Sequence, residues 1–184
     1  FTTSNLRGIE WDGTNFWLAD NTTKTVYICN TSFSLISTVA LTVSENIIGI
    51  TLYNNKIFVS TNAALYRIAF DGTVEARITA ESLGFQSNGI LGSAKANNKY
   101  LMCYGRNGSN YYYAFLDTNG NTMYLRDVTD ESSTASVFCF VNNEYYANSN
   151  FYIRHRTGAR EFAYIGGVGA HTKLPSTITK TNTN

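Results

Sequence analysis

One short segment of the chain gathers the kinds of side chain that hold a hard metal ion. Residues 127 to 133 read D-V-T-D-E-S-S, and the carboxylates among them are Asp127, Asp130 and Glu131. Carboxylate and hydroxyl oxygens at this density suit Ca²⁺, although the spaced D-x-[DN]-x-[DN]-G pattern of an EF-hand loop is absent. These three residues are the candidate metal ligands, with calcium as the candidate cofactor.

Tyrosine is the second residue type with a chemical use, since the chain contains 13 of them. The runs 111–113 and 145–146 place rings on both faces of a strand, because successive strand residues point to opposite sides. Beside Asn, Ser and Thr, a tyrosine that points away from the packed face gives an adaptable contact surface. Packing between sheets on both faces is the alternative interpretation. The candidate ligand-binding tyrosines are Tyr111, Tyr112 and Tyr146.

Basic residues gather in one place, on either side of a predicted turn at Thr157-Gly158. A solvated hairpin tip accounts for most clusters of this kind, and contact with an anionic ligand is the other interpretation, which adds Arg154 and Arg156 to the candidates. The whole chain carries 14 basic and 13 acidic residues, a formal net charge of +1. We therefore expect no nucleic-acid partner, because such binders show a basic excess.

No catalytic signature is present in the sequence. The two histidines, His155 and His171, do not lie at zinc-ligand spacing, and the chain lacks a G-x-S-x-G elbow, a phosphate loop and a dinucleotide fingerprint. The aspartate box of sialidase propellers is not matched either. We predict that the protein is not an enzyme; a lyase or glycosidase would need paired carboxylates. Most other aspartates fall at predicted turns, where such a side chain caps its own backbone: Asp12, Asp20, Asp71 and Asp117.

The elements that must position these residues repeat along the chain. The apolar-turn-apolar pattern of residues 8–19 recurs less closely at 49–60, 92–103 and 137–148. Its turns are spaced 41, 43 and 45 residues apart, at Gly13, Asn54, Asn97 and Asn142. That period is the size of one β-propeller blade.

A second strand-turn-strand pattern follows in each copy, at residues 25–33, 65–73, 112–120 and 151–158. Glycine stands where a tight turn needs a positive φ, a conformation that costs other residues about 1 kcal/mol or more. Those glycines are Gly72, Gly120 and Gly158. Two hairpins in each of four repeats predict about sixteen strands.

The predicted fold is all-β: a small β-propeller of about four four-stranded blades, with a twisted β-sandwich as the alternative. A single blade cannot cover both of its faces, so blades pack face to face around an axis. Large aromatic side chains would fill the space between blades. They are Trp11, Trp17, Phe58, Tyr100, Phe140 and Tyr145.

Composition divides the chain into two parts. Residues 1–165 form the predicted propeller, and residues 166–184 form a glycine-rich exit followed by an extended polar segment, typical of a linker. No stretch is long and apolar enough to span a bilayer. The three cysteines lie in apolar strand patterns without a C-x-x-C pair, which predicts buried free thiols and a reducing compartment during folding: Cys29, Cys103 and Cys139.

The phrase GIEWDGTNFWLAD at residues 8–20 resembles the blade opening of secreted and phage-encoded β-propeller repeats. The segment KLPSTITKT at residues 173–181 resembles the L-P-x-x-[IV]-T-K-T segments of bacteriophage tail and spike proteins. The first resemblance implies the fold, and the second implies a virion protein.

Together these features predict a non-enzymatic attachment domain on the virion surface. Its expected partner is a cell-surface glycan or protein receptor, with no membrane insertion and with homo-oligomers formed through flanking or C-terminal segments. The alternative is a structural tail nozzle, fibre or filament subunit that uses the propeller as a rigid assembly module, its open-ended tail adding to a neighbour's sheet edge.

Overall fold

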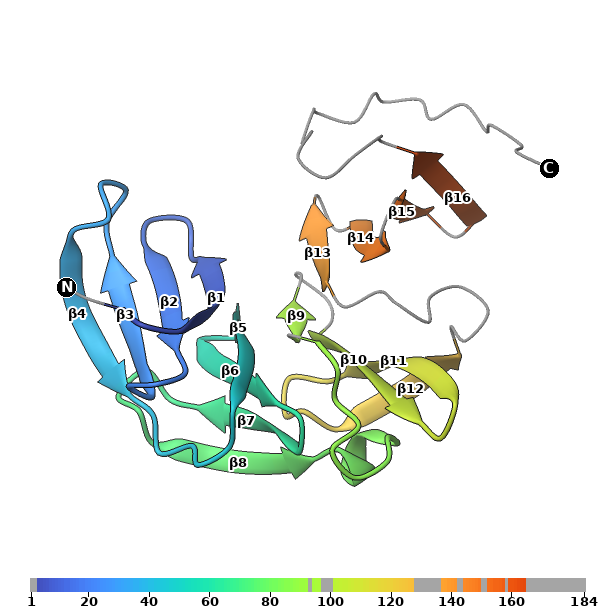
Figure 1. Ribbon diagram of the computed structural model, residues 1–184, viewed down its shortest axis with the longest axis horizontal. Coiled ribbons are helices and arrows are strands. Elements are labelled where there is room, and N and C mark those ends of the chain that lie inside the picture. The colour runs from blue at the N-terminus through green and yellow to red at the C-terminus, as the bar shows by residue number, and fades with distance from the viewer. Residues whose placement is uncertain are drawn as a thin grey trace. The chain divides into compact units, whose positions relative to one another are not determined.

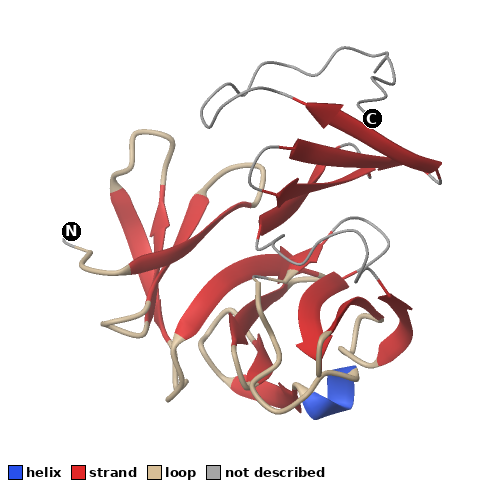
Figure 2. Ribbon diagram, turned by 45° about the vertical axis from the view of Figure 1, so that its right-hand side comes forward, coloured by secondary structure: helices blue, strands red, loops and turns tan. Residues whose placement is uncertain are grey.

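A computed structural model describes residues 3–92, 94–96, 101–127, 137–141, 144–149, 152–157 and 159–164 of the 184-residue chain. From residue 137 onward the description covers the backbone. Within these ranges the chain is all-β, as predicted, apart from one short 3-10 helix, η1 (Glu81–Leu83), drawn blue in Figure 2.

The strands follow one another in chain order in Figure 1. They are β1 (Leu6–Trp11), β2 (Phe16–Asp20), β3 (Thr25–Cys29), β4 (Leu35–Ala40), β5 (Ile47–Tyr53), β6 (Lys56–Thr61), β7 (Ala64–Ile68), β8 (Val74–Thr79), β9 (Lys95–Ala96), β10 (Leu101–Asn107), β11 (Asn110–Leu116), β12 (Thr122–Asp127), β13 (Val137–Val141), β14 (Glu144–Ser149), β15 (Tyr152–Thr157) and β16 (Ala159–Tyr164).

Each predicted repeat forms one four-stranded antiparallel meander. The first sheet is β1-β2-β3-β4, the second β5-β6-β7-β8, the third β9-β10-β11-β12 and the fourth β13-β14-β15-β16. The chain divides into two compact units, Phe1–Thr129 with the first three sheets and Asp130–Asn184 with the fourth. The predicted exit segment, 166–184, lies outside the described residues.

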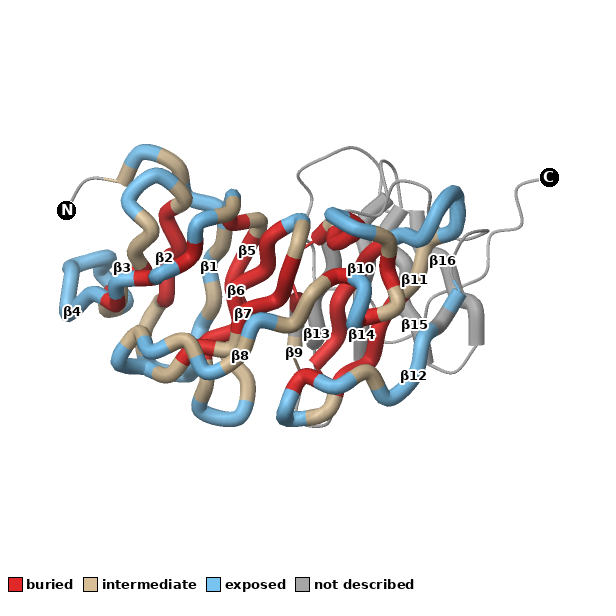
Figure 3. Tube along the Cα trace, turned by 90° about the horizontal axis from the view of Figure 1, so that it is seen from below, coloured by how far each residue is buried: buried red, intermediate tan, exposed pale blue. Residues whose placement is uncertain are grey.

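The second sheet is buried on both of its faces, which shows how the sheets of the first unit pack. Along β6, Ile57 and Val59 join an apolar cluster with the first sheet, while Phe58 between them joins a cluster with the third. This alternation follows from the two-residue period of a strand. In Figure 3 the buried stretches accordingly concentrate on β5 to β7 and on β10 and β11.

The turns have the chemistry that the sequence predicts. Gly13, Gly72 and Gly120 have φ angles of 99°, 92° and 89°, in the left-handed region that favours glycine. The aspartate prediction is also confirmed: Asp117 Oδ1 accepts the backbone N–H groups of Asn119 and Asn121 at 2.8 and 2.9 Å. Asp12, Asp20 and Asp71 form the same kind of side-chain-capped turn.

The prediction that large aromatics fill the space between sheets is confirmed for Trp17 and Phe58, which are buried, and wrong for Trp11, which is 43% exposed. Trp11 lies on the outer face of the first sheet, paired with Phe16. No sheet precedes β1 in the described part of the first unit to cover this face, whereas the equivalent face of the second sheet packs against the first sheet. The side chains of Tyr100, Phe140 and Tyr145 lie outside the description.

Cys29 and Cys103 are buried free thiols, as predicted. Burial raises the pKa of the Cys103 thiol to about 12 and also raises the pKa of Cys29, so both stay protonated and unreactive at neutral pH. The side chain of Cys139 lies outside the description.

Across the residues described, no helix has the length and apolar character needed to cross a membrane.

Candidate functional site

The candidate tyrosines Tyr111 and Tyr112 stand at the end of the β10–β11 hairpin. In its register Arg106 pairs with Tyr111 and Asn107 with Asn110, and residues 106–110 are exposed. We call residues 106–112 the tip. Tyr111 and Tyr112 are both half-buried.

The two rings take opposite faces of the third sheet, as the alternation predicts. Tyr112 packs against the apolar cluster shared with the second sheet, and its hydroxyl accepts a 3.3 Å hydrogen bond from Asn110 Nδ2. Tyr111 stacks on Tyr104 on the other face, with ring centroids 6.0 Å apart and an interplanar angle of 13°. Tyr112 therefore serves mainly in packing, the alternative interpretation given for it, while Tyr111 lies on the other face beside the buried ring of Tyr104.

The loop at residues 84–91 holds the tip against the body of the unit. Gln86 N donates to Arg106 O at 2.9 Å, and Arg106 N donates to Gly89 O at 2.8 Å. Gln86 Oε1 also accepts the backbone N–H of Gly108 at 2.9 Å. These bonds fix the tip backbone before any ligand arrives, which lowers the entropic cost of binding.

Gly105 allows this loop to lie directly on β10. A Cβ at Gly105 would stand 2.5 Å from a ring carbon of Phe85 and 2.7 Å from the carbonyl oxygen of Gly89. We expect Gly105→Ala to lower the free energy of unfolding by about 2 kcal/mol, the usual cost of overpacking a filled site. Chemical denaturation measures this loss of stability. Gly108→Ala is the control, because nothing lies within 4 Å of a Cβ there. Its φ of 62° means that alanine meets only conformational strain at that position. An equal loss in both variants would contradict the close contact.

The candidate calcium ligands are only partly described. Asp127 is exposed at the end of β12 and pairs with Tyr112 in the β11–β12 register, so the sheet brings two predicted site residues together. Asp130 and Glu131 lie outside the described residues. Within the described ranges no group of three His, Cys, Asp or Glu side chains could hold a metal ion. Calcium binding stays a prediction.

The remaining candidates belong to the second unit, where the backbone register is known. Tyr146 of β14 pairs with His155, whereas Arg154 pairs with Ala147 and Arg156 with Tyr145. The register thus places neither arginine opposite Tyr146.

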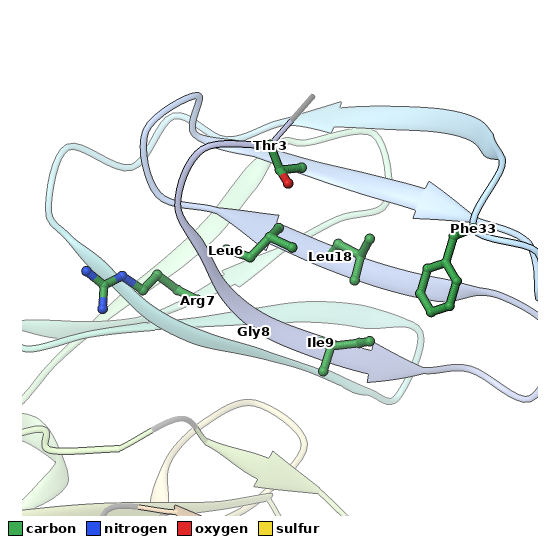
Figure 4. Close-up of a pocket in the computed structure, with 7 residues that line it drawn as sticks. All are labelled: Thr3, Leu6, Arg7, Gly8, Ile9, Leu18 and Phe33. Carbon is green, nitrogen blue, oxygen red and sulfur yellow. The ribbon is translucent and has the colours of Figure 1, made fainter. Parts of the chain in front are cut away.

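Sequence reasoning missed an apolar hollow on the first sheet, shown in Figure 4. Thr3, Arg7 and Gly8 line this hollow together with four apolar side chains. The apolar side chains are Leu6, Ile9, Leu18 and Phe33. The alternation of Ile9 and Trp11 along β1 signals an apolar outer face, but the sequence does not show that this face is left open. Aromatic rings extend the surface, because Phe16 stacks on Phe33 at 4.9 Å and contacts Trp11 at 4.6 Å between ring centroids.

The described carboxylates are already engaged in structural interactions. Glu45 accepts hydrogen bonds from the Tyr66 hydroxyl at 2.5 Å and from Arg77 at 2.8 Å. Burial acts to raise the pKa of Glu45, but these bonds outweigh it and lower the pKa to about 2. Glu75 is held by Lys56 and by Arg67, and these partners lower its pKa.

Seven carboxyl groups have a lowered pKa, because hydrogen bonds and nearby cations outweigh burial: Asp12, Asp20, Glu45, Asp71, Glu75, Glu81 and Asp117. A general acid at neutral pH needs the opposite shift. These seven carboxylates are therefore suited to holding turns and sheets together.

Comparison with known proteins identifies the fold. No protein-family profile matches the chain, and neither does any curated protein sequence. Among solved structures, the hydrazine synthase of Kuenenia stuttgartiensis matches with a TM-score of 0.59 at 12% identity, over 86% of this chain and 53% of that one. A streptogramin B lyase matches with a TM-score of 0.59 at 11% identity, over 89% and 55%. The Pan2 WD40 domain of Neurospora crassa matches with a TM-score of 0.55 at 9% identity, over 89% and 54%.

The fold is propeller-like. At these identities the likeness extends to the fold alone. Similar structures include enzymes, such as a glutaminyl cyclase from Myxococcus xanthus, as well as the WD40 domain, so they share no single activity. This chain spans about half the length of the first propellers it matches.

Proposed function

We propose that this protein is a non-enzymatic attachment domain that recognises a cell-surface glycan or protein through the tip of its third sheet. The supporting observation is that the tip presents exposed Arg106 and Asn110 beside half-buried Tyr111 on a backbone fixed by the 84–91 loop. Rigid tyrosine anchors among adaptable polar groups suit recognition at low entropic cost. The lowered carboxyl pKa values support a role without acid-base chemistry.

A position on the virion surface is part of this proposal, and it is supported by the resemblance of residues 8–20 and 173–181 to phage proteins. A role as a rigid assembly module is the second candidate. The exposed apolar outer face of the first sheet favours it, because contiguous apolar surface of this kind marks a contact site.

Binding of the fluorescently labelled protein to a panel of bacterial cells and to a glycan array tests attachment. Tyr111→Ala is expected to weaken binding about 30-fold, as loss of an aromatic anchor does, and Tyr112→Phe about fivefold, because it keeps the packing and loses the hydroxyl. Phe70→Ala is the matched control, since Phe70 is an exposed aromatic residue in the turn between β7 and β8 of the second sheet. Absence of binding to every cell and glycan, with Ca²⁺ present, would contradict the proposal.

Removal of Ca²⁺ with a chelator tests the predicted calcium site separately. If Asp127, Asp130 and Glu131 hold Ca²⁺ and binding depends on it, EDTA should weaken cell binding and added Ca²⁺ should restore it. Isothermal titration with CaCl₂ should then show heat for the unmodified protein and much less for Asp130→Asn. Titration without heat in the unmodified protein would remove calcium from the proposal.

A further inference from the structure

Arg106 of the tip carries a positive charge that the protein itself does not use. Other described cations bind acceptors within the chain, either in ion pairs with Glu45 or Glu75 or through a hydrogen bond to a carbonyl oxygen. They are Lys24, Lys56, Arg67 and Arg77. Among the residues whose side chains the structure describes, none binds the exposed guanidinium group of Arg106. That group can therefore pair with a ligand without first breaking an internal contact.

The guanidinium group lies on the same face of the third sheet as an aromatic ring. Arg106 stands directly opposite Tyr111 in the β10–β11 register. Residues paired in this way share a face, with Cβ atoms about 5 Å apart. Asp127 pairs with Tyr112 and therefore lies on the opposite face. The tip thus presents a cation beside an aromatic ring that stacks on Tyr104 beneath it.

The loop at residues 84–91 fixes the position from which this arginine reaches out. It binds both backbone groups of Arg106, since Arg106 N donates to Gly89 O and Arg106 O accepts from Gln86 N. A guanidinium group is a planar fork of donors that matches two oxygen atoms of a carboxylate or a sulfate at once. An arginine on a fixed backbone is therefore suited to recognise an oxyanion of this shape.

The composition of the tip favours a saccharide over a protein surface. Its exposed residues, 106–110, read R-N-G-S-N and include no large apolar side chain. A specific protein–protein contact buries about 800 Å² on each partner around an apolar core, which this segment lacks. Asn107 Nδ2 donates to Gly84 O at 3.4 Å, and Asn110 Nδ2 donates to the Tyr112 hydroxyl at 3.3 Å. These bonds position two amide groups that can bind sugar hydroxyls.

We propose that the tip binds an acidic saccharide. The guanidinium group of Arg106 pairs with a carboxylate or sulfate group of the sugar, and the ring of Tyr111 packs against the C–H face of the same sugar. This inference rests on the proposed attachment function and names the ligand class of that site. The cation is a different one from the basic residues of β15 that the sequence suggested as an anion contact.

A glycan array probed with the full chain tests the proposal. The array should hold matched pairs, in which each sialylated, uronic-acid or sulfated oligosaccharide stands beside its neutral counterpart. We expect the acidic member of a pair to bind about tenfold or more tightly than the neutral one, because a charge-assisted bidentate contact is strong. The carboxylated and sulfated pairs distinguish which oxyanion the tip prefers.

Substitutions of Arg106 connect this preference to one side chain. Arg106→Gln should weaken binding to the acidic glycans about 30-fold and leave binding to the neutral ones unchanged. Arg106→Lys keeps the charge but loses the planar fork, so we expect a loss of about fivefold. Arg7→Gln is the matched control, because Arg7 is also an exposed arginine and lies on β1 of the first sheet. All three variants should keep the thermal midpoint of the unmodified protein.

The outcomes separate this inference from the attachment function. Equal binding to the acidic and neutral members of each pair would overturn the acidic saccharide and leave attachment standing. The same holds for an acidic preference that Arg106→Gln retains, and for cell binding that protease treatment of the cells abolishes while no glycan is bound. Absence of binding to every cell and glycan would overturn both proposals.

Discussion

Gly8→Ala is expected to lower the free energy of unfolding by about 3 kcal/mol, at the upper end of overpacking effects. A Cβ at Gly8 would stand 2.7 Å from the backbone nitrogen of Ile50 and 3.0 Å from the Cα of Gly49. Both atoms belong to β5, so relief would require β1 and β5 to move apart. That movement would open the apolar cluster between the first and second sheets, which contains Ile47 and Ile50.

Gly13→Ala is the informative control for this experiment. Gly13 lies in the β1–β2 turn with a φ of 99° and with nothing within 4 Å of a Cβ, so alanine there meets conformational strain without a clash. We expect Gly13→Ala to lower the free energy of unfolding by about 1 kcal/mol. Urea unfolding of the two variants under the same conditions measures the difference. A larger loss for Gly13→Ala would mean that β1 and β5 do not approach as closely as described.

Asp20→Ala is expected to lower the free energy of unfolding by about 3 kcal/mol or more at pH 7. The Asp20 carboxylate is fully buried; Oδ2 accepts the backbone N–H groups of Ser4 and Asn5, and Oδ1 accepts those of Thr22 and Thr23, all within 3.0 Å. It therefore fastens the segment before β1 to the β2–β3 turn. Alanine would leave these four donors without their acceptor.

The pH dependence of stability gives this prediction a second test. Burial acts to raise the pKa of Asp20, but the hydrogen bonds from Asn5, Thr23, Ser4 and Thr22 outweigh it and lower the pKa from 3.8 to about 2. Because the folded-state pKa lies below the unfolded one, the carboxylate stabilises the fold above about pH 4. That contribution is lost as the pH falls through 2.

Unfolding free energies of the unmodified protein and of Asp20→Asn should therefore differ by a constant amount from pH 5 to 7 and converge below pH 4. Asp71→Asn is the control, because Asp71 forms the same kind of turn on the surface and accepts the Thr73 N–H alone from the backbone. The unfolding free energy of Asp71→Asn should differ much less from that of the unmodified protein. A gap between unmodified protein and Asp20→Asn that stays the same down to pH 2 would contradict the assigned role of the carboxylate.

In the candidate site, some features follow from the local sequence and others depend on contacts between sheets. The tyrosine run predicted rings on opposite faces, and Tyr111 and Tyr112 confirm this, because alternation depends only on the strand itself. The sequence did not indicate which ring packs in the core. That depends on the second sheet, which covers Tyr112 and leaves Tyr111 against Tyr104.

The sequence by itself determined the strands, their grouping into four meanders and the chemistry of the turns. Each of these depends on neighbouring residues: period-two alternation for strands, and left-handed glycines or aspartate caps for turns. Tertiary structure alone decided which apolar face is covered. Trp11 and Trp17 stand in the same apolar repeat, yet Trp17 is buried against the second sheet and Trp11 is exposed. Burial depends on whether another sheet packs on that face, and local sequence does not encode that contact.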